Sequence, residues 1–282
     1  MKNYSIGIYE KAFPEELSIR EMLICAKKAG YDFFEISIDR TDKRISRIYN
    51  EAVVKDYIKS MDEVGIGIES VGLSALGTYT LGNSNACVRK KGIDIFFHAL
   101  KFAKKIGARM IQIPACDVPK NDVNDKLTHR KYIDNLRKIM KVAAKEGVLI
   151  GLENMENDYA DTVEKCIKII QEVKSPYLVL YPDSGNITSA SIIYGNNPLE
   201  DLRKACGMCI AFHFKETKPN KYGGLFYGEG HVDFMPIAKE ALEIGIRRFV
   251  MEYWYTGNPN WKEDLVRARK MVNKWFGGEK KC

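Results

Sequence analysis

A recurring unit of helix, glycine and apolar run constrains the fold of this chain more than any other feature. Six times a charged helical pattern reaches a glycine and then a run of apolar residues, at Gly30, Gly65, Gly107, Gly147, Gly207 and Gly245. Glycine is favoured just after a helix because it adopts a left-handed backbone without steric cost. Lysines ahead of several of these glycines also complement the negative end of the helix dipole. The pattern therefore predicts six helices that each end at a glycine and lead into a β-strand.

Two further apolar runs, at 5–9 and 177–183, bring the strand candidates to eight. The runs are continuously apolar, which indicates a sheet covered on both faces. Helical patterns lie between them, near 17–29, 51–64, 90–106, 129–146, 160–173, 197–206, 234–244 and 260–276. This alternation predicts a single-domain α/β fold, a (β/α)8 TIM barrel over residues 1–282, with 277–282 as a frayed tail. A doubly wound open sheet competes, but no G-x-G-x-x-G turn follows the first run, and even spacing favours closure.

Four polar side chains stand at the ends of consecutive apolar runs: Glu153, Asp183, His213 and Glu252. They are about 30 to 40 residues apart, the length of one strand–helix unit. In a barrel, the carboxyl ends of the strands meet at one face, where active sites lie. Three carboxylates and one imidazole there predict a divalent-metal site, which Mg, Mn, Co or Zn would accept. Any one of these residues alone is better explained as a helix N-cap or a loop salt bridge, but four in consecutive units favour the metal.

Composition limits the other classes of function. The chain is 45% hydrophobic and 11% aromatic, enough for a large core. No apolar stretch approaches the ~20 residues of a membrane helix, and the start lacks the apolar segment of a secretory signal. Seven cysteines without a disulfide spacing are typical of a reducing cytoplasm. The net charge is +7, but paired lysines recur on successive helices, so we expect a solvated outer ring and no nucleic-acid or membrane partner.

Longer stretches carry a resemblance to a known family. They read GIYEKAFP (7–14), YDFFEISID (31–39) with RISR (44–47), GLSAL (72–76), YPDSGN (181–186), HFKETKP (213–219) and GEGHVDF (228–234). In this order and over nearly the whole chain, the sequence resembles the L-ribulose-5-phosphate 3-epimerase family, also called L-xylulose-5-phosphate 3-epimerase. That family belongs to the xylose-isomerase-like TIM barrels.

The resemblance implies one divalent metal ion held by Glu153, Asp183, His213 and Glu252. It also implies that Glu153 and Glu252 are catalytic, one removing the C3 proton of a ketose phosphate and the other delivering a proton to the opposite face. A C3 proton beside a ketone is weakly acidic, so the enediolate needs the stabilisation that a Lewis acid gives. Related barrels are commonly dimers or tetramers, and we expect a homo-oligomer here.

Five further residues are candidates for substrate binding: Lys215, Glu216, His231, Glu35 and Ser74. Lys215 either contacts a substrate oxygen or phosphate or pairs with Glu216. His231 lies in a glycine-flanked loop that either closes over substrate or is an ordinary loop. Glu35 and the nearby Asp39 match the family stretch, but an internal salt bridge with Arg44 or Arg47 explains them equally well.

One segment departs from the resemblance. Where the family pattern leads us to expect a His-Arg-Arg cluster, as in LSAHRRFPLGS, this chain has Leu76, Gly77 and Thr78. Arginine matches phosphate well because of its planar fork of donors. The substrate therefore either lacks a phosphate, as in a tagatose-, allulose- or L-ribulose-type ketose 3-epimerase, or has it bound elsewhere, for example by Lys215 or the amides near Gly228 and Gly230.

Two other classes of function fit the same barrel less well. A nuclease of the endonuclease IV kind needs a multi-metal cluster rich in histidine, whereas this chain has four histidines in all. A metal-free sugar-binding barrel would not need both Glu153 and Glu252.

Overall fold

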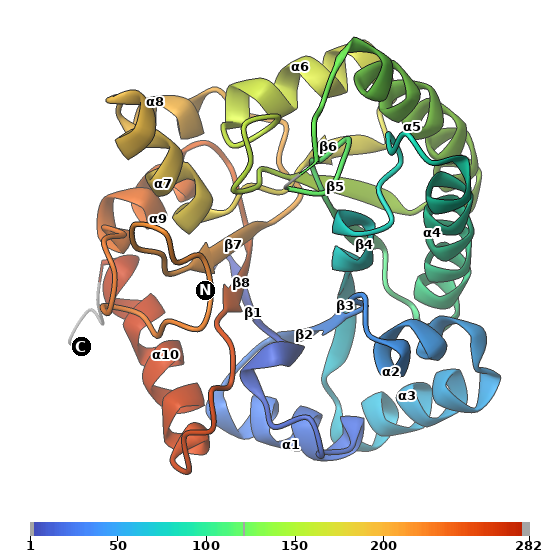
Figure 1. Ribbon diagram of the computed structural model, residues 1–282. Helices are drawn as coiled ribbons and strands as arrows, with labels where there is room; N and C mark the ends of the chain where they lie inside the picture. The colour runs from blue at the N-terminus through green and yellow to red at the C-terminus, as the bar shows by residue number, and fades with distance from the viewer. Residues whose placement is uncertain (1–2, 121, 278–282) are drawn as a thin grey trace.

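The strands form one parallel sheet that curls into a barrel. The computed structural model describes residues 3–120 and 122–277. The strands are β1 (Ser5–Tyr9), β2 (Phe33–Ser37), β3 (Gly67–Gly72), β4 (Met110–Pro114), β5 (Leu149–Glu153), β6 (Leu178–Leu180), β7 (Phe212–Lys215) and β8 (Arg248–Glu252). Their order is β6-β5-β4-β3-β2-β1-β8-β7, and isolated parallel bridges join the two end strands, at Leu180–Cys209 and Asp183–His213. The predicted (β/α)8 barrel is confirmed (Figure 1).

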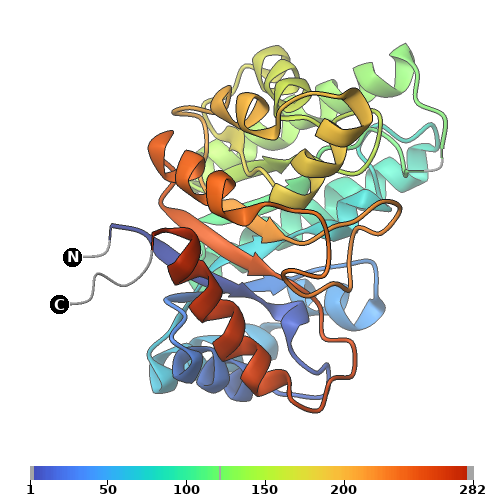
Figure 2. The same cartoon turned by 90° about the vertical axis from the view of Figure 1, so that its left-hand side faces the viewer.

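Helices surround the sheet, as Figures 1 and 2 show. They are α1 (Ile19–Ala29), α2 (Asp42–Ile45), α3 (Glu51–Val64), α4 (Ala86–Ile106), α5 (Lys126–Glu146), α6 (Val163–Val173), α7 (Ser184–Tyr194), α8 (Pro198–Arg203), α9 (Phe234–Glu243) and α10 (Trp261–Trp275). Short 3-10 turns are η1 (Glu10–Ala12), η2 (Ser46–Tyr49) and η3 (Ser74–Gly77). The eight predicted helical patterns all correspond to helices, whereas α7 and the short α2 were not predicted. None of the described helices is long and apolar enough to span a membrane.

Four of the six predicted helix-ending glycines cap their helices. Gly30, Gly65, Gly107 and Gly147 follow α1, α3, α4 and α5 with φ between 66° and 87°, where a side chain would be strained. Gly245, with φ 95°, directly follows Ile244, the cap residue of α9, and ends that helix as predicted. For Gly207 the prediction was wrong by position, because α8 already ends at Arg203 with Lys204 as its cap. Of the predicted frayed tail, 278–282 lie outside the described residues.

Inside the barrel, the side chains toward the carboxyl ends of the strands are polar, and those in the layer before them are apolar. A small buried cluster separate from the main core contains Tyr9, Phe33, Met110, Tyr181, Ala211 and Val250. Side chains alternate along a strand, so the next inward-facing position on β2, β4, β7 and β8 lies two residues further on. Those positions hold Glu35, Gln112, His213 and Glu252, all buried. The strand register therefore places a layer of polar side chains at the carboxyl end of the barrel, next to an apolar layer.

Candidate metal centre and active site

Four consecutive units supply the central side chains. Glu153 and Glu252 are the last residues of β5 and β8, as the sequence predicted. His213 is instead the second residue of β7, which ends at Lys215. Asp183 follows β6 by three residues and is the N-cap of α7. Parallel strands bring all four to the same end of the barrel, although their sequence positions relative to the strand ends differ.

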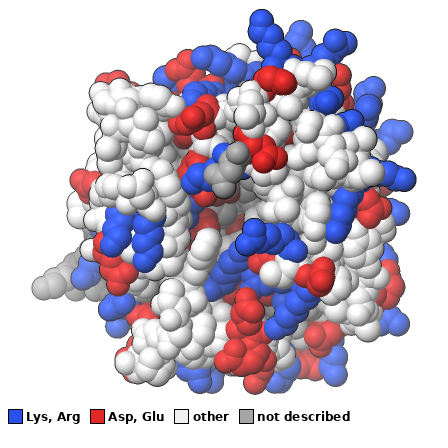
Figure 3. Space-filling view, viewed as in Figure 1, with Lys and Arg blue, Asp and Glu red and all other residues white. Residues whose placement is uncertain are grey.

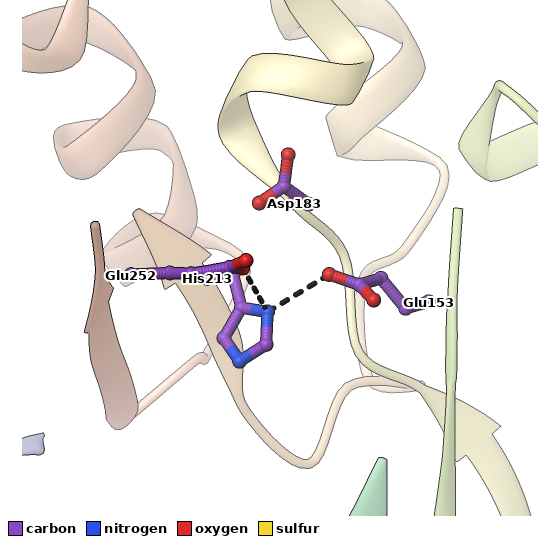
Figure 4. Close-up of side chains that lie close together, drawn as sticks. All are labelled: Glu153, Asp183, His213 and Glu252. Carbon is purple, nitrogen blue, oxygen red and sulfur yellow. Dashed lines mark hydrogen bonds and ion pairs between the residues drawn. The ribbon is translucent and has the colours of Figure 1, made fainter. Parts of the chain in front are cut away.

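The four side chains converge on one point, as Figure 4 shows. His213 Nδ1 lies 2.8 Å from Glu153 Oε1 and 2.9 Å from Glu252 Oε2. One ligand atom from each of the four residues, Asp183 included, lies within 4.8 Å of the other three. All four side chains are buried, so the group could hold a metal ion shielded from bulk water.

An unpaired oxygen and excess negative charge fit a cation at this point. The buried atom Asp183 Oδ2 accepts no hydrogen bond from the described residues, whereas Glu252 Oε2 has His213 Nδ1 as its contact, at 2.9 Å. Four buried carboxylates, of Glu35, Glu153, Asp183 and Glu252, face two buried cationic side chains, His213 and Lys215. Burying unbalanced charge is costly, so an excess of two negative charges calls for a counter-ion. The hard oxygen donors with one imidazole suit a divalent metal.

The pKa values of these groups follow from burial and from this crowding. Burial raises the pKa of Asp183, although Lys215, with Nζ 3.3 Å from Asp183 Oδ1, acts in the opposite direction. Burial alone would lower the pKa of His213, but the carboxylates of Glu35 and Glu252 outweigh it and raise that pKa well above its usual value. A proton on His213 thus partly neutralises the cluster, in the position where a metal would bind.

Glu35 fixes the orientation of the imidazole. His213 Nε2 lies 2.8 Å from Glu35 Oε1, and the hydroxyls of Ser70 and Tyr181 donate to Glu35 Oε2 at 2.6 and 2.7 Å. A proton on Nε2 is therefore donated to Glu35, which leaves Nδ1 directed at the other carboxylates. Such an acceptor is typical behind a metal-binding histidine.

The alternative salt bridge for Glu35 is not formed. Arg44 instead contacts Asp39 at 3.2 Å, and Arg47 contacts Glu10 at 2.6 Å. The salt-bridge interpretation was therefore correct for Asp39 and Arg44 but wrong for Glu35.

Several supporting residues were not predicted from the sequence. Gln112 on β4 donates to Glu153 Oε2. Asn154 accepts from the backbone N–H of Asp183, and the side chain of Asn186 donates to the Asn154 carbonyl. A lone polar residue within the apolar run MIQIP, and an amide directly after Glu153, were the available signals.

A cavity of about 590 Å³ opens above the group. Its lining includes Glu153, His213, Lys215 and Glu252 at the bottom. It is also lined by residues from the strand-end loops: Lys11, Asp39, Arg40, Thr41, Ser74, Gly77, Thr78, Met155, Glu156, Tyr222, Gly223 and Trp254. In the view of Figure 3 this face of the molecule is hollowed at its centre. A small polar molecule in this space would reach the carboxylates and His213.

Some of the candidates for substrate binding line this cavity and others do not. Lys215 lines it and pairs with Asp183, so its proposed pairing with Glu216 is not formed. Ser74 lines it too, and its buried hydroxyl contacts no partner among the described residues. Glu216 and His231 are not among the lining residues.

Glu216 and His231 instead hold the loop that follows β7. The carboxylate of Glu216 accepts backbone N–H groups of Gly228 at 2.8 Å and Val232 at 3.1 Å. The ring Nε2 of His231 lies 2.9 Å from the hydroxyl of Thr217. These contacts favour a structural role, the ordinary-loop alternative in the case of His231.

The fold and the site agree with comparisons to known proteins. Residues 25–274 match the xylose isomerase-like TIM barrel family, and the chain belongs to it. The chain is 31% identical over 280 residues to the putative L-ribulose-5-phosphate 3-epimerase SgbU of Escherichia coli (strain K12), covering 96% of both chains. It is 30% identical over 273 residues to L-ribulose-5-phosphate 3-epimerase UlaE of Escherichia coli (strain SMS-3-5 / SECEC), covering 96% of this chain and 94% of UlaE. Within the barrel family it therefore belongs with the L-ribulose-5-phosphate 3-epimerases, and it is an isomerase.

A solved structure shows the same fold. The crystal structure of a D-psicose 3-epimerase in the presence of D-fructose superposes with a TM-score of 0.79 at 18% identity, over 97% of this chain and 100% of that chain.

Proposed function

We propose that this isomerase is a metal-dependent 3-epimerase that interconverts L-xylulose 5-phosphate and L-ribulose 5-phosphate. The names of its relatives support the reaction. The observation that carries the proposal is the pair of carboxylates, Glu153 and Glu252, that meet one imidazole nitrogen from two different strands. An epimerase needs two such groups, because the proton leaves one face of C3 and returns to the other.

The chain offers a complete set of ligands for the metal. Glu153, Asp183, Glu252 and Nδ1 of His213 would hold it, and Glu35 would keep His213 in the binding orientation. A bound divalent ion supplies Lewis-acid stabilisation of the negative charge that develops on the substrate oxygens.

The two glutamates carry the proton. One carboxylate takes the C3 proton and the other gives a proton to the opposite face, and the two exchange roles in the reverse direction. Gln112 holds Glu153 by donating to Oε2, which leaves Oε1 directed toward His213. Lys215 contacts Asp183 and lies in the same cavity, where its ammonium would balance negative charge on the substrate.

A free ketose is the second candidate for the substrate. Gly77 and Thr78, which replace the expected arginines, line the cavity and carry no charge. This favours a ketose without phosphate unless other cations bind the phosphate.

The experiment is a substrate panel in heavy water. The metal-stripped protein is assayed with and without added Mn²⁺ on L-xylulose 5-phosphate, free L-ribulose, D-tagatose and D-allulose. We expect activity only with metal, deuterium at C3 of the product, and the highest kcat/KM for the phosphate ester. Full activity in thoroughly stripped protein contradicts metal dependence, and deuterium only at C1 would indicate an aldose–ketose isomerase. A higher kcat/KM for a free ketose would replace the proposed substrate with the second candidate.

The expected cytoplasmic location and the expected dimer or tetramer stay predictions. The former is supported by the six described cysteines, all free thiols.

A further inference from the structure

One side of the cavity mouth is cationic. Lys11 in η1 and Arg40, three residues after β2, both line the cavity. Figure 3 shows basic side chains gathered along one rim of the central hollow, over the segment between η1 and α2. Among the described residues, no carboxylate lies within ion-pair distance of Arg40, which is exposed.

The nearby acidic residues do not cancel this charge. Asp39 contacts Lys11 and Arg44 at 3.2 Å each and accepts the backbone N–H and the hydroxyl of Thr41. Glu15 contacts Arg44 at 3.4 Å. Among the residues that line this side of the cavity, two cations, Lys11 and Arg40, therefore stand against one carboxylate, Asp39. The contacts of Asp39 position Lys11 and leave Arg40 available to an anion.

The opposite side of the mouth carries a carboxylate among its lining residues. Glu156 lines the cavity three residues after β5, which the strand order places across the barrel from β1. An anionic group on a substrate would therefore be drawn to the β1–β2 side, where the net charge is positive.

Arg40 stands beside the segment that departs from the family pattern. The backbone N–H of Ala75 in η3 donates to the carbonyl of Ile38 at 3.0 Å, which packs η3 against the end of β2. Gly77 and Thr78 line the cavity on that side and leave it open. A cation from the neighbouring strand end can occupy the place where the expected arginines are missing.

The other candidate groups for phosphate binding are already engaged. Lys215 is buried and pairs with Asp183 among the carboxylates. The amide of Gly228 donates to Glu216, and neither Gly228 nor Gly230 lines the cavity.

We propose that Arg40, assisted by Lys11, binds the terminal phosphate of an open-chain ketose phosphate whose keto end lies at Glu153 and Glu252. This inference rests on the proposed function. The planar guanidinium of Arg40 would donate two hydrogen bonds to the phosphate oxygens, and the ammonium of Lys11 would add a point charge. The site replaces the missing arginine cluster with cations from the segments that follow β1 and β2.

The kinetic test compares two substrates in two variants. Arg40→Met keeps the length of the apolar stem and removes the guanidinium. The ratio of kcat/KM for L-xylulose 5-phosphate to that for free L-xylulose should fall by about 10-fold or more, the scale of one charge-assisted contact. Arg130→Met, an exposed arginine on α5, is the matched control and should keep the wild-type ratio. An unchanged ratio in Arg40→Met overturns the proposal.

A binding test separates this inference from the proposed function. Ribitol 5-phosphate has no carbonyl and cannot be epimerised. It should raise the Tm of the metal-free wild type and of Arg130→Met more than ribitol does, and this difference should largely vanish in Arg40→Met. If the wild type turns over neither ketose but shows this pattern, the proposed function fails and the phosphate site stands. If Arg40→Met binds ribitol 5-phosphate as the wild type does, the site is wrong and the epimerase function is unaffected.

Discussion

Glu153 and Glu252 contact the same imidazole nitrogen, and this shared contact defines their expected roles. Replacing either by Gln keeps an oxygen for a metal but removes the carboxylate that moves the proton. We expect Glu153→Gln and Glu252→Gln each to lower kcat by at least about 100-fold, the usual scale of acid–base catalysis. The measurement is turnover at saturating Mn²⁺, with the metal content checked in each variant.

Solvent exchange gives the same prediction a sharper form. With one base removed, the other still reaches one face of C3. Each variant should therefore exchange the C3 proton of only one of the two epimers for deuterium, and the two variants should select opposite epimers. Exchange into both epimers by one variant would contradict a two-base mechanism.

Glu35 acts through His213 rather than on the substrate. Its carboxylate accepts from His213 and from two hydroxyls, and a Gln amide would place N–H groups against some of these donors. We expect Glu35→Gln to weaken metal binding by about 10- to 100-fold, as measured by calorimetric titration of Mn²⁺. Glu69→Gln, which removes a carboxylate paired with Arg248 in another part of the barrel, is the control. Wild-type metal affinity in Glu35→Gln would show that the carboxylate does not orient the ligand.

Among the helices, α7 shows how one residue serves two purposes. The sequence left two interpretations of Asp183 open, helix cap or metal ligand. Asp183 Oδ1 accepts the backbone N–H of Asn186 and caps α7, whereas Oδ2 is buried and has no hydrogen-bond partner within residues 3–120 and 122–277. Asp183 can therefore be a helix cap through one oxygen and a metal ligand through the other. The hydrogen bond of the cap holds the carboxylate in the orientation that a metal ligand needs. The helix itself escaped prediction because its first eight residues are buried without an amphipathic stripe.

The loop after β7 depends on close backbone contacts that only glycine permits. A Cβ on Gly230 would lie 2.1 Å from the Thr217 carbonyl oxygen and 2.3 Å from Glu216 Oε1. We expect Gly230→Ala to lower the free energy of unfolding by about 1–3 kcal/mol, the cost of overpacking a filled site. Urea unfolding measures this. Gly67→Ala, where the nearest atom would be 4.0 Å away, is the control and should be near neutral. Equal stability of the two variants would mean that the loop relaxes without cost.

On the scale of the whole molecule, the candidate metal site lies where the barrel has its fewest strand-to-strand pairings. Strands β6 and β7 are joined by isolated bridges, one of them between Asp183 and His213, while the other neighbours share ladders of three or more paired residues. The four ligands come from β5, the end of β6, β7 and β8, so a bound ion would tie both sides of this junction together.

Metal should therefore stabilise the entire fold. At 100 times its dissociation constant, a ligand contributes about 2.7 kcal/mol. For a chain of 282 residues we expect Tm to rise by about 5 °C on adding Mn²⁺ to stripped protein. Asp183→Asn should lose most of this rise, which calorimetry would measure. An unchanged Tm in wild-type protein that demonstrably binds Mn²⁺ would indicate that the ion does not stabilise the junction of β6 and β7.

The sequence by itself determined the barrel and the four central residues. Glycine-terminated helices and doubly covered apolar strands are local features with a fixed period, so their count and direction follow without knowledge of contacts. Glu153 and Glu252 stand at the ends of their strands. They therefore had to lie at the same face of the barrel, because parallel strands place their carboxyl ends there.

Only the tertiary structure decided which partners these residues have. Glu35 and His213 are 178 residues apart, and no local pattern distinguished that contact from a salt bridge with Arg44 or Arg47. In the same way, Glu216 turned out to face the backbone of its own loop and Lys215 to face Asp183. The physical reason is that periodicity fixes which face of an element a side chain occupies, whereas a hydrogen-bond partner depends on the distance between elements that only the closed barrel sets.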